Sequence, residues 1–278
     1  MPLFKANALQ LEIGEAPDAD AITYINANNI TRLQQQAGIC RLVKFLKDKS
    51  LWTTLAGGFL FGNRVGASSG TSLPDLKGGT AATLTGGSHE VNGIYMNGNN
   101  ADEISFGART FTNNFMPSVY VLFSSYNATG STTSSRINFG PLSSTSAYRG
   151  FQPHTHNGTG SATLVQLQAY RGDGNRYLGS GSLSSFPLNA NFVGAAFSSS
   201  NQLILGGQNA NANNSTSTIA AAMTFTAGAT WLLGPFENGS KTSTELTTVS
   251  ACLFWNSDTA LTPQFVSQLD SLLREFVC

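Results

Sequence analysis

The feature that most constrains the fold of this chain is a long series of short apolar runs separated by turn residues. From about residue 56 onward, runs such as 118–124 and 247–255 are divided by segments rich in Gly, Asn, Ser and Pro. The run 163–170 alternates apolar and polar residues, as a strand with one buried face does. Many strands at this spacing, with no helical pattern between them, predict an antiparallel β-sandwich or barrel. A parallel α/β fold is excluded because its crossover helices are missing.

Helical patterns precede this region. Asp18 stands at the N-cap position and Asp20 in the first turn of a helix that we predict over 19–28. A second helix is predicted over 32–49, where Thr31-Arg-Leu-Gln34 has the spacing of a capping box and an apolar stripe follows.

A third helix is predicted near the C-terminus. Thr262 suits an N-cap, and Pro263 suits the first helical position, where a missing N–H does no harm. The apolar residues that follow recur at helical spacing, so we expect a short amphipathic helix laid on the sandwich. The chain thus divides into a helical docking or assembly segment, 1–56, and a β-sandwich, 57–278.

Charged residues are unusually rare. They form 11% of the chain, with 15 basic and 15 acidic residues and a formal net charge of zero, whereas soluble domains average about 25%. Nucleic-acid binding needs clustered Lys and Arg, and the one basic concentration, 41–49, alternates with apolar residues as the solvated face of a helix does. No signal peptide and no apolar run of about 18 residues is recognised. We therefore expect synthesis in the cytoplasm, no nucleic-acid partner and no membrane insertion.

Metal and thiol chemistry is weakly indicated. Cys40, Cys252 and Cys278 lack the spacing of a zinc site or a disulfide framework, so free thiols are expected. His154 and His156 would share one face of an extended strand, but no third ligand is evident, and their flanks indicate a loop with solvated histidines. We predict no cofactor and no metal site.

The segment Arg171-Gly-Asp173-Gly-Asn175 allows three interpretations. It contains the integrin tripeptide, and Asp173 with Asn175 would suit a calcium site of the legume-lectin kind. Because it follows a strand and is rich in residues that tolerate positive φ, we interpret it first as a hairpin turn.

Aromatic residues next to polar loops are the candidate ligand-binding residues. Tyr126, Tyr148, Phe151 and Tyr170 lie near stretches rich in Asn and Thr. Sugars are held by aromatic rings that stack on their apolar faces, while amides and carboxylates bind the hydroxyls. These four residues are predicted to form a glycan-binding site, although aromatic residues in such a fold also line the core.

The order of several short motifs resembles that of concanavalin A-like (laminin-G-like) sandwiches. Near the C-terminus, Trp231-Leu-Leu-Gly234, the Asn238-Gly239 turn, Cys252-Leu-Phe-Trp255 and Ala260-Leu-Thr-Pro-Gln264 follow the order of that family. Leu73-Pro-Asp-Leu-Lys-Gly-Gly79 and Gly93-Ile-Tyr-Met-Asn-Gly98 are similar to its early strands. The segments 26–31 and 45–52 resemble the helical lead-in of such sandwiches in bacteriophage structural proteins. The resemblance covers about half of the chain and implies a jelly-roll sandwich.

The resemblance also bears on catalysis. Laminarinase-type enzymes of this fold carry two Glu and an intervening Asp at alternate positions of one strand, which places all three on one face. No such run exists here, and Asp102, Glu103 and Glu237 have no matching partners at that spacing. We predict a protein that is not an enzyme, with a polysaccharide lyase or hydrolase as the weakest alternative.

From the resemblance we expect a phage virion protein: a fibre, spike or decoration subunit that contacts other virion subunits. It implies assembly as a homo-oligomer, for which a trimer is one candidate, and location in the virion. A surface of Ser, Thr, Asn and Gly suits such a role because it stays soluble without strong electrostatic fields. The alternative is a lectin module that recognises a polysaccharide of the host surface.

Overall fold

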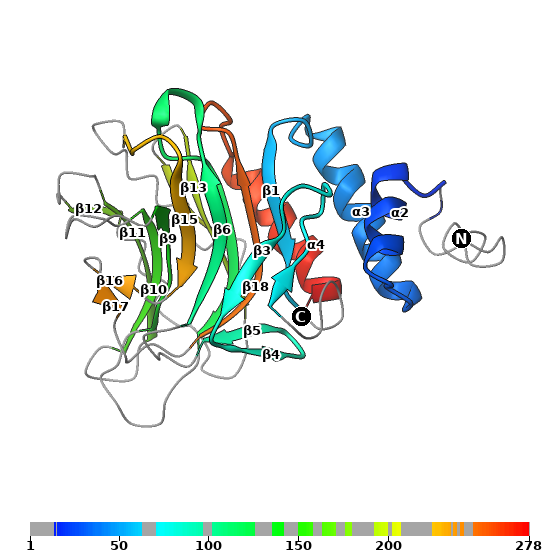
Figure 1. Ribbon diagram of the computed structural model, residues 1–278, viewed down its shortest axis with the longest axis horizontal. Helices are drawn as coiled ribbons and strands as arrows, with labels where there is room; N and C mark the ends of the chain where they lie inside the picture. Colours follow the sequence, from blue (N-terminus) through cyan, green and yellow to red (C-terminus); the bar gives the residue numbers. More distant parts are fainter. Residues whose placement is uncertain are drawn as a thin grey trace.

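The computed structural model shows two stacked β-sheets with helices on one of them (Figure 1). The structure describes residues 14, 16–62, 71–96, 102–125, 135–141, 150–157, 163–170, 176–179, 192–199, 202–206, 224–234, 236–237, 240–241 and 247–277. Every strand pair within these ranges is antiparallel. The prediction of a mainly β, antiparallel sandwich with flanking helices is therefore confirmed.

One sheet, called sheet A below, has seven strands in the order β14-β13-β7-β18-β5-β4, with β1 also paired to β18. The long strand β18 is its centre, because it pairs with β1, β5 and β7. The strands are β1 (Leu55–Leu60), β4 (Ser88–Glu90), β5 (Gly93–Met96), β7 (Val119–Ser125), β13 (Phe192–Ser198), β14 (Gln202–Gly206) and β18 (Thr247–Trp255).

The other sheet, sheet B, has nine strands in the order β12-β11-β10-β9-β15-β6-β3-β2, with β8 paired to β10. Its strands are β2 (Ser72–Leu73), β3 (Ala82–Thr85), β6 (Glu103–Arg109), β8 (Ser135–Arg136), β9 (Asn138–Pro141), β10 (Phe151–Asn157), β11 (Thr163–Tyr170), β12 (Arg176–Gly179) and β15 (Ala229–Gly234). A separate two-stranded hairpin joins β16 (Phe236–Glu237) to β17 (Ser240–Lys241) on either side of the predicted Asn238-Gly239 turn, which itself lies outside the described residues.

The two sheets enclose an aromatic interior centred on Phe254 of β18. Its ring centroid lies 5.2 Å from that of Phe106, 5.3 Å from Phe139, and 6.1 Å from both Phe59 and Phe111. Both sheets contribute to this cluster, since Phe106 and Phe139 belong to sheet B. Aromatic rings at these separations attract one another in addition to the free energy of their burial.

The helices are α2 (Ala19–Ala27), α3 (Leu33–Asp48), the short 3-10 turn η1 (Thr112–Asn114) and α4 (Pro263–Val277). Two of the predicted caps are confirmed. Asp18 is the N-cap of α2 and accepts a hydrogen bond from the Asp20 backbone N–H at 2.9 Å. Thr262 directly precedes α4, which begins at Pro263, and its Oγ1 accepts a hydrogen bond from the Phe265 N–H at 3.2 Å.

The capping box predicted for the second helix is wrong. The N-cap residue of α3 is Arg32, one position later than expected, and its side chain makes no capping hydrogen bond. The buried Gln36 instead donates from Nε2 to the carbonyl of Ile30 at 2.7 Å. The start of α3 is thus fixed through the turn from α2, which spacing alone does not reveal.

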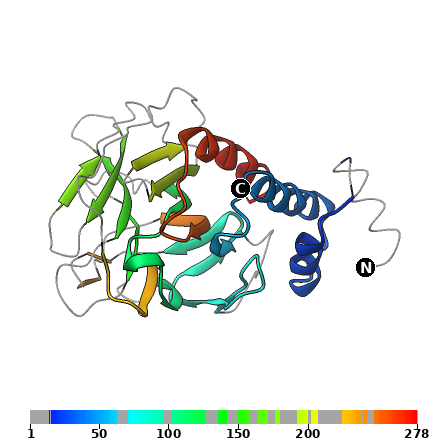
Figure 2. The same ribbon diagram turned by 90° about the horizontal axis from the view of Figure 1, so that it is seen from above.

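Helices cover the face of sheet A that is turned away from sheet B (Figures 1 and 2). Helix α4 packs against β13, β14 and β18, and α3 packs along α4. Gly38 permits that close approach, because a Cβ there would lie 2.3 Å from Cγ of Phe276. One apolar cluster joins α2, α3 and α4 to β1, β7 and β18. Every residue of β18 is consequently buried, which explains why its sequence is an unbroken apolar and small-residue run.

The helical segment therefore shares an interior with the sandwich. Trp255 at the end of β18 packs edge-on against Phe265 at 5.8 Å and donates from Nε1 to the carbonyl of Leu51 at 3.0 Å. Whether the segment 1–56 also docks onto a neighbouring subunit stays a prediction. Within the described part of the chain, no helix is long and apolar enough to cross a bilayer.

The structure corrects the expected loop around the two histidines. His154 and His156 belong to β10, a seven-residue strand whose every position pairs with β11. The sequence of β10 has few strand formers, because Pro153 and the two histidines interrupt it. The partner strand specifies this conformation, so it could not be read locally.

Candidate functional site

The structure describes two of the four predicted glycan-binding residues, Phe151 and Tyr170. Tyr126 and Tyr148 lie outside the described residues. Phe151 is fully buried between the sheets, with its ring centroid 6.4 Å from that of Phe197. This corrects the expectation for Phe151, because a ring with no exposed face cannot stack on a sugar. Tyr170 is the last residue of β11, where it pairs with Arg176 of β12.

Of the two predicted residues that the structure describes, Phe151 is interior and Tyr170, at the end of β11, is the one that leads to a candidate surface.

The pairing register of the neighbouring strands defines which residues belong to that surface. Because Phe151 is in the interior, strand alternation places positions 152, 154 and 156 of β10 on the outer face of sheet B. Cross-strand pairing carries the same face to β8, β11 and β12. We call this surface the β8–β12 face; its positions are Arg136, Gln152, His154, His156, Leu164, Gln166, Gln168, Tyr170, Arg176 and Leu178.

Two rows cross this face. In the first, His154 pairs with Arg136 on one side and with Gln166 on the other. In the second, Gln168 pairs with Gln152 and with Leu178. Directly opposed residues in neighbouring strands lie about 5 Å apart and form one continuous surface. The rows place positions occupied by Gln, His and Arg in register on the same face of sheet B as Tyr170.

The middle of sheet B is covered on its outer side. Leu232 of β15 and Asn138 of β9 alternate with the interior residues Leu233 and Phe139, yet their exposed fractions are 2% and 0%. The candidate surface accordingly comprises the outer strands β10 to β12 with β8. In Figures 1 and 2, β11 and β12 lie at the end of the molecule remote from α2 and α3.

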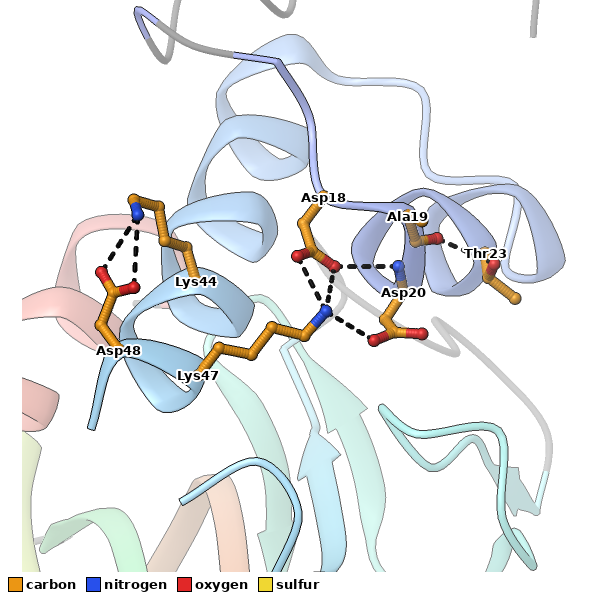
Figure 3. Close-up of polar contacts among 7 residues, drawn as sticks. All are labelled: Asp18, Ala19, Asp20, Thr23, Lys44, Lys47 and Asp48. Carbon is orange, nitrogen blue, oxygen red and sulfur yellow. Dashed lines mark hydrogen bonds and ion pairs between the residues drawn. The ribbon is translucent and has the colours of Figure 1, made fainter. Parts of the chain in front are cut away.

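A second polar cluster lies among the N-terminal helices (Figure 3). Lys47 Nζ lies 2.8 Å from Asp18 Oδ2 and 2.7 Å from Asp20 Oδ2. Burial tends to raise the pKa of Asp18, but its bonds to Lys47 and to the backbone outweigh burial and hold that pKa below its ordinary value. The cluster ties α2 to α3 and confirms that the basic stretch is a helix face.

Trp52 is half-buried beside this cluster. The ammonium groups of Lys47 and Lys77 lie 5.6 Å and 5.8 Å from its ring centroid. Lys77 also donates to the carbonyls of Thr53 and Leu55, at 3.4 Å and 3.1 Å. These groups already bind one another, so the arrangement fastens the end of α3 to the start of β1.

Two buried carboxylates also have structural partners. Asp75 accepts hydrogen bonds from the backbone N–H groups of Gly58 and Lys77, both at 3.1 Å. Asp270 of α4 accepts from Tyr120 Oη at 3.1 Å and from Arg274 Nε at 2.8 Å. Burial raises the pKa of both carboxyl groups above the ordinary value.

We expect a pH dependence of stability from Asp270. Its pKa is higher in the folded chain than the ordinary 3.8, so the folded state holds this proton more tightly. That contribution to stability is full below pH 3.8 and is lost as the pH rises through the raised pKa. Urea unfolding of the wild type and of Asp270→Asn from pH 4 to 7 measures it. The unfolding free energy of the wild type, measured relative to that of Asp270→Asn, should fall as the pH rises. If this relative stability stayed constant or rose, the raised pKa of Asp270 would be contradicted.

The described residues contain no group of three potential metal ligands. Asp102, one of the carboxylates singled out by sequence, is buried, and its Oδ1 accepts from the Gly87 N–H at 2.8 Å, which fixes a turn. Cys40 and Cys252 are buried free thiols, as predicted, and burial raises the pKa of Cys252. Asp173, Asn175 and Cys278 lie outside the described residues.

Sequence reasoning missed most of the β8–β12 face. The alternation in 163–170 was recognised, and it identifies Gln166, Gln168 and Tyr170 as one face. The contributions of β8, β10 and β12 were not, because these strands carry no apolar periodicity. A search for polar residues at alternate positions on both sides of the predicted hairpin 171–175 would have suggested them.

Comparisons with known proteins give a fold and no family. No family model matches the chain, and no curated protein matches it. Among solved structures, Trypanosoma rangeli sialidase with 2,3-difluorosialic acid aligns with a TM-score of 0.52 and 12% identity, over 88% of this chain and 40% of that chain. The same sialidase with sialic acid gives 0.50 and 13%, over 81% and 34%. This chain thus spans well under half of the sialidase.

A third solved structure is domain 4 of AbnA, an extracellular GH43 arabinanase from Geobacillus stearothermophilus, in complex with arabinotriose. It aligns with a TM-score of 0.46 and 16% identity, over 78% of this chain and 98% of that chain. Together with the two antiparallel sheets, the sialidase alignments show that this chain has a β-sandwich fold like that of the aligned part of the sialidase, the kind of fold that the resemblance to concanavalin A-like sandwiches implied.

Proposed function

We propose that this protein is a carbohydrate-binding module without catalytic activity, and that its β8–β12 face holds the glycan. The observation that carries the proposal is the register of β8, β10, β11 and β12, which places positions occupied by Gln, His and Arg on the same face of sheet B as Tyr170. Its support from the sialidase structures extends only to the shared fold.

The chemistry of these residues suits sugar hydroxyls. A Gln amide both donates and accepts hydrogen bonds, as a hydroxyl group does, and a neutral imidazole does the same with its two nitrogens. An aromatic ring offers an apolar surface to the C–H face of a sugar. A strand surface with these residue types at successive outer positions would bind an extended polysaccharide along its length.

We expect Tyr170→Ala to weaken glycan binding about tenfold or more, equivalent to about 1.4 kcal/mol, because a buried aromatic contact often dominates such sites. Binding of the full chain is measured by titration calorimetry against polysaccharides selected on a glycan array. Tyr170→Phe should keep most of the affinity. Tyr95→Ala, which removes a half-buried ring from β5 in the other sheet, is the matched control.

If the wild type and Tyr170→Ala bound the glycan with equal affinity, the glycan-binding site would have to lie on another surface. If the protein bound no glycan on the array and did not bind intact host cells, the glycan proposal would be wrong. Depolymerisation of the polysaccharide during long incubation would instead support the enzyme alternative.

As a second candidate, we propose that the module works on the surface of a phage virion. The favouring observation is that α2 and α3 lie at the end of the molecule remote from β11 and β12 (Figure 1). One end could then attach to other virion subunits, as a homo-oligomer, while the other reaches a host glycan. Immunogold labelling of purified particles tests this location, and native mass spectrometry that shows only monomers at micromolar concentration would contradict the oligomer.

A further inference from the structure

Asp75 is a buried carboxyl group where the N-terminal helices meet the sandwich. The residue is only 6% exposed and pairs with Phe59 of β1 in an isolated β-bridge. The next residue, Leu76, belongs to the apolar cluster that α2, α3 and α4 share with sheet A. The backbone of Gly79 lies against the carboxylate, because a Cβ there would be 2.5 Å from Asp75 Oδ2. Little water can therefore solvate this group when it is ionised.

The positive groups around Asp75 compensate its charge only in part. Two backbone N–H groups donate to its Oδ1, those of Gly58 and Lys77. The ammonium group of Lys77 donates to two backbone carbonyls instead. Arg109 of β6 likewise donates from Nε and Nη1 to backbone carbonyls, and its Nη2 is buried with no hydrogen-bond partner among the described residues. Both cations thus attract the carboxylate without a hydrogen bond from their side chains to it.

Helix α2 contributes Tyr24 to the same region. Tyr24 is 3% exposed, and its Oη is buried without a hydrogen bond to any other described residue. Burial, and after it the negative charge of Asp75, raises the pKa of this phenol, so the two side chains interact electrostatically. Near its start, α2 is held differently, through the ion pairs of Asp18 and Asp20 with Lys47 of α3 (Figure 3).

From this arrangement we infer that Asp75 makes the docking of α2 pH dependent, with tighter docking at acid pH. An ionised carboxylate is disfavoured where water is excluded, whereas its protonated form is much less affected. Detachment of α2 removes Tyr24 and admits water to Asp75, which relieves the ionised form. The docked state therefore binds the proton of Asp75 more tightly than the open state does. This inference is independent of the proposed glycan binding.

The pKa of Asp75 agrees in direction. Burial raises it above the ordinary 3.8, although the N–H groups of Lys77 and Gly58 and the charges of Arg109 and Lys77 act against burial. The contribution to docking is full below pH 3.8 and is lost as the pH rises through the raised pKa. Asp18 has the opposite sign: its pKa is lowered from 3.8, so its contribution is lost only below that pH. In mildly acidic solution the effect of Asp75 is therefore the one to be seen.

Hydrogen exchange of the full chain, followed by mass spectrometry from pH 4.5 to 7.5, tests the inference. Protection factors, corrected for the intrinsic pH dependence of exchange, should fall about threefold or more in peptides of α2 as the pH rises, and less in peptides of β18. Asp75→Asn, which cannot ionise, should abolish the fall in α2. The matched control is Asp48→Asn, which removes a 59% exposed carboxylate from α3 and should behave as the wild type does.

Several outcomes would overturn the inference. In the wild type alone, α2 protection that stayed constant or rose with pH would do so, whether or not Asp75→Asn folds. An equal fall in α2 and β18 would show a loss of global stability in place of undocking. Asp270→Asn tests the other buried carboxyl group, and the fall in α2 should persist in that variant. Loss of the fall in Asp270→Asn or in Asp48→Asn would assign the effect to a carboxylate other than Asp75.

Discussion

Replacing Phe254 by alanine is expected to lower the free energy of unfolding by about 3–5 kcal/mol, the usual range for a fully buried phenylalanine. Its ring contacts aromatic residues of both sheets, as described above, and Arg109 lies over one face at 5.7 Å from the ring centroid. A Cβ at Gly57 would lie 2.3 Å from the tip of this ring. Because the backbone of β1 contacts the ring directly, the cavity left by alanine has little freedom to collapse.

Urea unfolding followed by tryptophan fluorescence measures this loss. Phe254→Leu, which keeps most of the volume, should lose clearly less than Phe254→Ala. The control is Val91→Ala, since Val91 is 48% exposed and its truncation should change stability by less than about 0.5 kcal/mol. A loss below about 1 kcal/mol for Phe254→Ala would show that the sheets do not meet around this ring.

Removing the carboxylate of Asp270 is expected to have a comparable effect. Asp270→Ala leaves Arg274 and the fully buried Tyr120 hydroxyl without this partner. Breaking a buried charged pair on one side destabilises a protein by about 3–5 kcal/mol, and we expect the lower end because Arg274 is 16% exposed and reaches water. The variant should loosen α4 from sheet A and raise amide hydrogen exchange in α4 before that in β18.

The matched control is Asp48→Ala. Asp48 forms an ion pair with Lys44 at the same helical spacing, but both side chains are largely exposed, at 59% and 47%. Surface pairs of this kind contribute at most about 0.5 kcal/mol. If Asp270→Ala and Asp48→Ala lowered stability equally, the contact between Asp270 and sheet A would have no structural role.

The candidate site shows which of its residues could be predicted from the local sequence and which could not. Tyr170 was singled out because it lies next to a polar stretch, and the predicted alternation of its strand places Gln166 and Gln168 on the same face. Phe151 was assigned to the ligand because it follows a polar stretch, whereas the structure places it against Phe197. An aromatic residue at a strand start suits either environment, and only the partner strand decides which face is buried.

The helical segment gives the complementary case. Both helices were predicted almost to the residue, because Asp18 caps one and an apolar stripe marks the other. Their packing was not predicted. The near-continuous burial of α3 is visible only once α2, α4 and sheet A surround it.

The sequence by itself determined the class of fold and the helices and strands with a clear periodic pattern, because strand alternation, helix caps and turn residues act within a few positions of the chain. The tertiary structure alone decided that β10 is a strand, that Phe151 is interior, and that basic residues from β8, β10 and β12 share one face. The physical reason is that cross-strand pairing joins segments separated by long stretches of chain. Which residues become neighbours then depends on register, and register is fixed by burial of the opposite face.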